Sequence, residues 1–118
     1  MSLILASSSP FRKAILEKLG VSFITVSPDI DETRKTMETP YDLVYRLAEE
    51  KAQKIAKTHS GLIIASDQVA TLDSGNEEGD EILHKPLTHQ NAFAQLQKSS
   101  GRTAVSYTHL TLPTIYSV

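Results

Sequence analysis

Cysteine is absent from the 118-residue chain, which excludes a disulfide scaffold, a cysteine-based zinc site and a thiol nucleophile. An excess of one charge is also missing, because 12 basic and 14 acidic residues leave a formal net charge of −2. This balance argues against bulk electrostatic binding to nucleic acid or to an acidic membrane surface. No apolar run approaches the roughly 20 residues of a membrane span. The N-terminus lacks the basic start of a signal peptide, so we expect a cytoplasmic protein.

Several catalytic and phosphate-binding patterns are missing too. The four histidines have no metal-ligand spacing such as HExxH, and no Ser-His-Asp arrangement is indicated. Neither a Walker A motif nor GxGxxG occurs, which excludes P-loop and Rossmann phosphate binding. What is present is typical of one globular domain, with 40% hydrophobic and 22% charged residues.

The apolar pattern predicts an α/β fold. Strands are expected at residues 3–6, 21–26, 62–72 and 82–83. Helices are expected from Ser9-Pro10 to Gly20, over residues 41–57, and from Thr88 to near Gly101. The acidic segment 27–40 is expected to be a loop, and residues 73–81 the turn of a hairpin.

Residues 104–118 differ from the rest of the chain, because they contain no Lys, Arg, Asp or Glu. The run from Val105 to Leu110 resembles the translation of a transposon end used as a sequencing adaptor. This resemblance predicts that residues 104–118 are a non-native tail after a domain at residues 1–103. The alternative is a genuine edge strand followed by a tail.

The segment Ser7–Lys13 follows the first predicted strand and opens a helix. Unpaired amides and the positive end of the helix dipole attract anions at such a position. With its three hydroxyls and two cations, the segment could cradle a phosphate. The alternative is a plain serine cap with surface cations.

Lys51 and Asp67 stand out against apolar surroundings. Lys51 falls on the apolar stripe of the helix predicted at 41–57, where a lysine either extends to the rim or points into a cleft. In the second case, Lys51→Met should leave stability unchanged or raised while phosphate binding falls. Asp67 ends an apolar strand run, where a carboxylate either binds a ligand or caps a loop.

Two further groups are weaker signals when taken alone. The acidic residues Asp29, Asp31 and Glu32 lie in a loop and are usually solvated, but near Asp67 they could complete a magnesium site. Pro86 stiffens the chain beside Lys85 and could fix its direction, although a surface turn explains the pattern equally well.

Five motifs stand in one order along the chain: Leu5-Ala6-Ser7-Ser8-Ser9-Pro10-x-Arg12, Pro28-Asp29-Ile30-Asp31-Glu32, Arg46-Leu47-Ala48-x-x-Lys51-Ala52, Ser66-Asp67-Gln68-Val69 and Lys85-Pro86-Leu87-Thr88. Over residues 3–102 this order resembles the Maf-like family of nucleoside triphosphate pyrophosphatases. The resemblance implies a mixed sheet flanked by helices around a cleft, of the inosine-triphosphatase-like kind. It also implies hydrolysis between the α- and β-phosphates to a nucleoside monophosphate and pyrophosphate, with Mg²⁺ or Mn²⁺.

The fourth and fifth motifs resemble the 7-methyl-GTP subgroup, and dTTP or UTP are the alternative substrates. By position, the resemblance implies that Asp67 is the catalytic carboxylate and a metal ligand, and that Glu32 assists at the metal. It implies substrate contacts for Ser7, Ser9, Arg12, Lys13, Lys51, Gln68 and Lys85. At Lys13 the family often has an arginine, whose planar fork lysine lacks.

Family members continue well past this chain, so the resemblance implies a truncated domain with weak activity or none. A second interpretation is a non-catalytic fragment that binds a nucleotide or a partner, with a homodimer as one such assembly. A third is a fragment that does not fold stably. None of these interpretations involves nucleic acid or a membrane.

Overall fold

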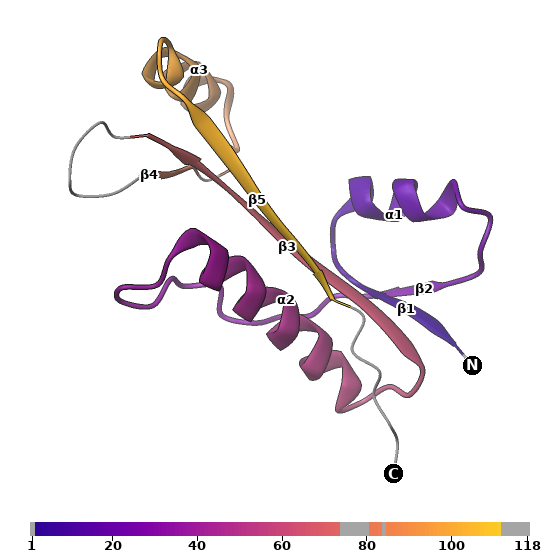
Figure 1. Ribbon diagram of the computed structural model, residues 1–118. Coiled ribbons are helices and arrows are strands. Elements are labelled where there is room, and N and C mark those ends of the chain that lie inside the picture. Colours follow the sequence, from indigo (N-terminus) through magenta and orange to yellow (C-terminus); the bar gives the residue numbers. More distant parts are fainter. Residues whose placement is uncertain (1, 74–80, 84, 112–118) are drawn as a thin grey trace.

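A computed structural model of the chain describes residues 2–73, 81–83 and 85–111 (Figure 1). Its elements are, in chain order, β1 (Leu3–Ala6), α1 (Pro10–Glu17), β2 (Ile24–Val26), α2 (Pro40–Ala56), β3 (Leu62–Leu72), β4 (Glu81–Leu83), α3 (His89–Ser99) and β5 (Ala104–Thr111). The expected α/β class, with a mixed sheet and flanking helices, is confirmed. No helix in the described part is long and apolar enough to cross a membrane.

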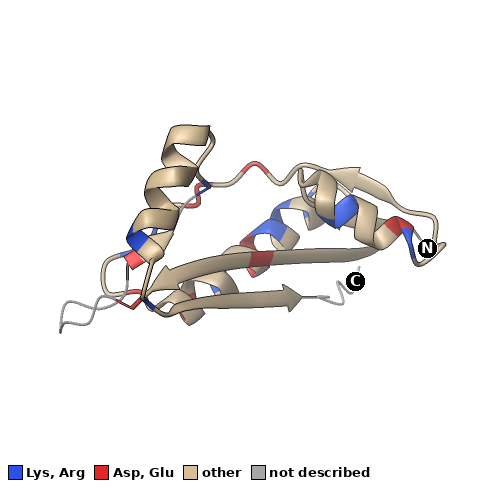
Figure 2. Cartoon of the chain, turned by 90° about the horizontal axis from the view of Figure 1, so that it is seen from above, with Lys and Arg blue, Asp and Glu red and all other residues tan. Residues whose placement is uncertain are grey.

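The long strand β3 organises the sheet, whose order is β2-β1-β3-β4 with β5 also on β3. The first part of β3 pairs in parallel with β1, up to the partners Leu5 and Ile64. From Ala65 onward β3 pairs antiparallel with β5, and near its end also with β4. The sheet therefore changes from parallel to antiparallel pairing along one strand. Figures 1 and 2 show α1 and α3 at opposite ends of the molecule, which measures 49 × 30 × 20 Å.

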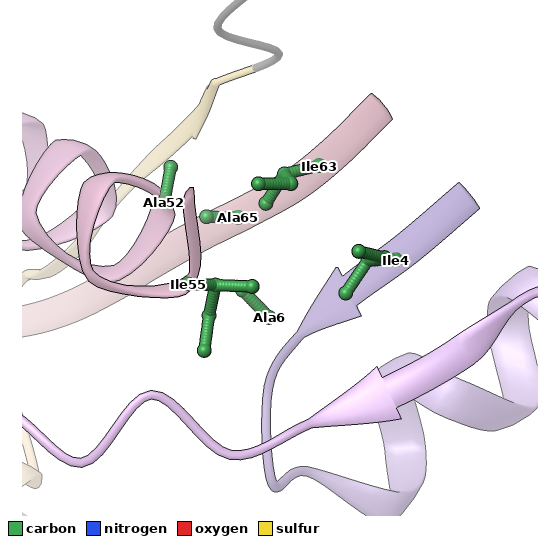
Figure 3. Close-up of a cluster of buried hydrophobic side chains, with 6 residues drawn as sticks. All are labelled: Ile4, Ala6, Ala52, Ile55, Ile63 and Ala65. Atoms are coloured by element: carbon green, nitrogen blue, oxygen red, sulfur yellow. The ribbon is translucent and has the colours of Figure 1, made fainter. Parts of the chain in front are cut away.

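Helix α2 supplies the helical side of the core. Thr39 caps it by accepting a hydrogen bond from the Asp42 N–H, and Pro40 occupies the first turn. One face packs on alternate residues of β3, as the helical and strand periods require. Figure 3 shows the first of two resulting clusters, made of Ile4, Ala6, Ala52, Ile55, Ile63 and Ala65. The second cluster consists of Leu43, Val44, Leu47 and Val69.

The predicted elements agree with the structure except at some ends. Helix α2 and strand β3 lie where they were expected, and Ser9 and Thr88 are the N-caps of α1 and α3. The strand expected at residues 21–26 is restricted to Ile24–Val26. Helix α1 ends at Glu17 and has no buried residue. Most of the expected turn, residues 74–80, lies outside the described residues.

Of the segment 104–118, the structure describes residues 104–111, which form β5 along β3. The assignment of residues 104–118 to a non-native tail stays a prediction, as does the domain boundary at residue 103.

Gly61 sets the start of β3 beside β1. Its φ of +132° lies in a region that side chains rarely adopt, and a Cβ there would collide with the carbonyl oxygen of Ser2. The next residue, Leu62, donates its N–H to that same oxygen at 2.8 Å. The close approach of the Gly61 backbone to the Ser2 backbone therefore requires glycine at position 61.

We expect Gly61→Ala to destabilise the protein more than Gly20→Ala does. Gly20 also has a positive φ, +71°, but nothing lies within 4 Å of an added Cβ. Gly20→Ala should cost about 1–2 kcal/mol from backbone strain alone, whereas Gly61→Ala adds a backbone collision. Thermal melts of both variants test this, and equal losses would contradict the role given to Gly61.

Candidate functional site

The site forms where the parallel part of the sheet ends. Pairing of β1 with β3 stops at Leu5 and Ile64. One alanine follows on each strand, and after it the chain turns polar, with Ser7 after β1 and Ser66-Asp67 on β3. In α/β sheets, ligands bind outside the carboxyl ends of parallel strands. Arg12, on the first turn of α1, crosses to β3 and donates from Nη1 to the carbonyl oxygen of Ser66 at 3.2 Å. The start of α1 is thereby joined to the Ser66-Asp67-Gln68 segment.

A buried ion pair between Lys51 and Asp67 lies at the centre of this region. The Lys51 Nζ is 3.0 Å from Asp67 Oδ1, and both residues are 8% exposed. Lys51 is on the buried face of α2, and Asp67 is on the face of β3 that packs against it. The lysine therefore points into the sheet–helix interface and does not extend to the rim.

Glu32 meets the same ammonium group from the loop before α2. Its Oε1 lies 3.0 Å from Lys51 Nζ, and its side chain is 57% exposed. Two carboxylates thus share one lysine, one of them buried and one facing solvent. The sequence alone predicted neither this proximity nor the lysine between them, and only the family resemblance placed Glu32 at a site with Asp67.

The serines of the predicted phosphate cradle form a capped turn. The Ser7 hydroxyl, which is buried, accepts from the Ser9 N–H at 3.0 Å. The Ser9 hydroxyl accepts from the Arg12 N–H at 3.3 Å. Each hydroxyl keeps its own hydrogen free to donate. The serine-cap interpretation is therefore correct locally, and it still leaves two hydroxyl donors beside Arg12.

The other three candidate residues, Lys13, Gln68 and Lys85, have exposed side chains outside the Lys51–Asp67 pair. Lys13 pairs with Glu17 at 4.0 Å on the exposed side of α1. Gln68 is exposed and donates from its amide to the Ser106 hydroxyl at 2.7 Å. Lys85 is exposed beside a hollow between β4 and α3 that Pro86, Asn91 and Lys98 also line. No interaction found among the described residues joins these three side chains to Asp67.

The carboxylates suit a metal ion that is shared with substrate. Within residues 2–73, 81–83 and 85–111, no group of three or more His, Asp or Glu side chains could hold an ion. Mg²⁺, however, is usually bound through one or two carboxylates together with substrate phosphates. Glu32 and Asp67 meet that smaller requirement, so the residues fit a divalent cation that arrives with a nucleotide.

A second charged group holds the loop that carries Glu32. Arg46 binds Glu38 through Nε at 2.6 Å and through Nη2 at 2.9 Å, and it also binds Glu50 at 3.2 Å. The Arg46–Glu50 pair follows from the spacing of one helical turn. The Glu38 contact has no such spacing. These hydrogen bonds lower the pKa of Glu38 to about 2 and raise the pKa of Arg46.

The family model described as Maf-like protein matches residues 2–116, nearly the whole chain. The chain belongs to the Maf-like family. A 7-methyl-GTP pyrophosphatase of Nitrosococcus oceani is 49% identical over 112 residues, which are 94% of this chain and 53% of that protein. A 7-methyl-GTP pyrophosphatase of Vibrio vulnificus is 49% identical over 108 residues, which are 92% and 53%. This Maf-like chain thus spans about half the length of the curated relatives it matches.

A solved structure gives the same picture of the fold. The Maf-like chain resembles a nucleoside-triphosphatase, a dITP/XTP pyrophosphatase of Mycobacterium abscessus, with a TM-score of 0.50 and 21% identity. The likeness covers 96% of this chain and 66% of the other. At this identity it bears on the fold alone, and it agrees with the inosine-triphosphatase-like sheet expected from the motifs.

Because Lys51 is buried against Asp67, we no longer expect Lys51→Met to leave the stability of the Maf-like chain unchanged or raised. The Lys51 ammonium neutralises a buried carboxylate, so Lys51→Met should leave Asp67 without a partner and lower the free energy of unfolding by about 3–5 kcal/mol. The double variant Lys51→Met/Asp67→Leu removes both charges and should recover most of that loss. Denaturant unfolding measures both values.

Lys57→Met is the matched control, because Lys57 is exposed at the end of α2. It should change stability by no more than about 0.5 kcal/mol. A double variant that is no more stable than Lys51→Met would contradict the buried-pair account.

The Arg46–Glu38 pair predicts an acid-sensitive part of the stability. The folded pKa of Glu38, about 2, lies below its usual value of 4.5. The stabilisation is therefore complete above about pH 4.5 and is lost as the pH falls toward 2. Thermal melts between pH 2 and 6 should show a smaller pH dependence for Glu38→Gln than for the parent chain. Glu17→Gln, which removes an exposed partner of Lys13, should leave the parent profile unchanged.

Proposed function

We propose that this chain carries the hydrolytic centre of a nucleoside triphosphate pyrophosphatase, with 7-methyl-GTP as its substrate. The observation that supports this most is the buried Lys51–Asp67 pair with Glu32 opposite, beside the capped turn that leads to Arg12. The names of the two curated relatives support the choice of substrate. The chain spans about half the length of these relatives.

The proposed division of labour follows from burial and charge. Arg12 and Lys51 bind phosphate oxygens and offset the charge that develops on them in the transition state. The hydroxyls of Ser7 and Ser9 donate to the same phosphates. Lys13 and Lys85, both exposed, contact the outer phosphates as the substrate arrives, and Gln68 contacts the base.

Asp67 acts as the general base in this proposal. When Lys51 turns from Asp67 to a phosphate, the freed carboxylate oxygen accepts a proton from a water molecule. That water attacks the α-phosphorus, the bond from this phosphorus to the bridging oxygen breaks, and pyrophosphate leaves. A divalent cation held by Asp67 and Glu32, Mg²⁺ or Mn²⁺, supplies Lewis-acid stabilisation of the phosphate charge when bound.

We further propose that the protein is cytoplasmic and that residues 1–103 are the part of the chain that belongs to the pyrophosphatase domain. Its competitor is a fragment that binds nucleotide without turnover, as a monomer or a homodimer. The half-length match to the relatives favours this second candidate.

Pyrophosphate release by the purified chain with Mg²⁺ tests the proposal, using 7-methyl-GTP, UTP, CTP and dTTP. We expect turnover of 7-methyl-GTP that Asp67→Asn lowers by about 10²–10⁴-fold, the usual contribution of a general base. Asp42→Asn, which removes an exposed carboxylate at the start of α2, should keep full activity.

The other outcomes separate the candidates. Saturable binding of 7-methyl-GTP by a cooperatively folded chain, without pyrophosphate release, would show the non-catalytic binding function. Faster turnover of dTTP or UTP would move the chain to the other substrate branch. A folded chain that neither binds nor hydrolyses a nucleotide would overturn the proposal.

A further inference from the structure

The loop between β2 and α2 carries Glu32 but contains no helix or strand of its own. Three basic side chains of α2 hold it. Lys54 donates to the carbonyl oxygen of Asp29, Lys51 pairs with Glu32, and Arg46 donates from Nη2 to the carbonyl oxygen of Thr33 at 3.1 Å. Glu32 therefore lies between two backbone anchors that α2 supplies.

Arg46 makes the more extensive of these two anchors. Its Nε and Nη2 grip both carboxylate oxygens of Glu38, a bidentate geometry that lysine cannot reproduce. The side chains of Arg46 and Glu38 are only 17% and 8% exposed. Partial exclusion of water makes this pair stronger than an ordinary surface pair.

Glu38 also accepts hydrogen bonds from other residues of the same loop. Its Oε1 accepts from the Lys35 N–H at 3.1 Å, and its carbonyl oxygen accepts from Arg34 Nε at 2.8 Å. Met37, next to it, has a φ of +67°, so the backbone turns through a left-handed residue there. The shape of residues 33–38 thus depends on the carboxylate that Arg46 holds.

We propose that Arg46, acting through Glu38 and the Thr33 carbonyl, is a positioning residue that fixes Glu32 opposite Lys51 and Asp67. Glu32 is 57% exposed and belongs to a loop, so its single ion pair with Lys51 leaves the backbone around it free to move. The hydrogen bonds of Arg46 to Glu38 and to the Thr33 carbonyl oxygen remove that freedom before a nucleotide binds. This inference rests on the proposed function for its catalytic consequence, but the positioning itself can be measured without turnover.

Amide exchange measured by NMR tests the positioning directly. The Thr33 N–H donates to Asp31 and the Lys35 N–H donates to Glu38, so both report on the loop. Arg46→Lys keeps the charge but loses the fork, and Glu38→Gln keeps the shape but loses the charge. We expect at least about tenfold faster exchange of both amides in either variant, where loop order depends on the pair.

Glu50→Gln is the matched control, because Glu50 binds the same guanidinium but belongs to α2 and not to the loop. It should leave both exchange rates unchanged. Exchange that is unchanged in Arg46→Lys and Glu38→Gln, or raised equally in Glu50→Gln, would overturn the inference. Melting temperatures of the three variants show that each one is folded.

Kinetics test the consequence for Glu32. Arg46→Lys should lower kcat for 7-methyl-GTP by about 10–100-fold, the usual effect of losing a residue that orients a ligand. In a Glu32→Gln background the same change should add no more than about twofold, since residues that act through one another are not additive. A full further loss in that background would overturn the route through Glu32.

The two proposals fail in different ways. A parent chain without any pyrophosphate release contradicts the proposed function, and the exchange rates then decide the positioning alone. Turnover by the parent chain with unchanged loop exchange in the variants leaves the proposed function intact and removes Arg46 from its mechanism.

Discussion

The buried Lys51–Asp67 ion pair is the interaction around which the candidate site is arranged. The 3.6-residue period of α2 places Lys51 on its buried face, and the two-residue period of β3 places Asp67 on the opposing face. One apolar cluster contains Ala52, Ile55, Ile63 and Ala65, and the other contains Leu47 and Val69, so the pair sits between them in sequence. An interface built for apolar contact thus contains one charge from each side.

Such a pair is poorly explained by stability. Removing two charges from water costs several kcal/mol per ion, and apolar residues of similar size commonly serve the fold as well or better. A helix–sheet interface that keeps a lysine and an aspartate therefore forgoes stability at this point. The site residues around them supply a reason: Arg12 donates to the carbonyl oxygen of Ser66, the residue before Asp67, and Glu32 pairs with the Lys51 ammonium. Figure 2 shows how charged positions gather along α2 beside the long strand.

The features that the sequence predicts are those set by residue periodicity and helix caps, whereas contacts made through an irregular loop are not predicted. The elements α2 and β3 follow from their apolar periods, and the caps Ser9 and Thr88 from their side chains, so all four agree with the structure. The positions of Lys51 and Asp67 on buried faces follow from the same periods. The proximity of Glu32 does not, because it depends on how an irregular loop returns to α2. The Arg46–Glu38 pair is not predicted for the same reason, since its partners are eight positions apart and Glu38 lies before the N-cap Thr39, outside the helix.

The candidate residues fall into a buried group and an exposed group, and each group suits a different step in the binding of the proposed triphosphate substrate. A buried lysine cannot meet a nucleotide that stays in solution, whereas Lys13 and Lys85 can attract its phosphates from a distance. In the proposed reaction the anhydride must then come to Asp67, the proposed proton acceptor, which lies 3.0 Å from the Lys51 ammonium. Exposure also explains why Glu32 needs external support. Asp67 lies on β3 where this strand pairs with β5, and Lys51 lies on a seventeen-residue helix, but Glu32 lies on a loop. A site that combines a rigid buried pair with a carboxylate on a loop keeps its geometry only if the loop is tied to one of the rigid elements, and α2 provides that tie through Arg46 and Lys54.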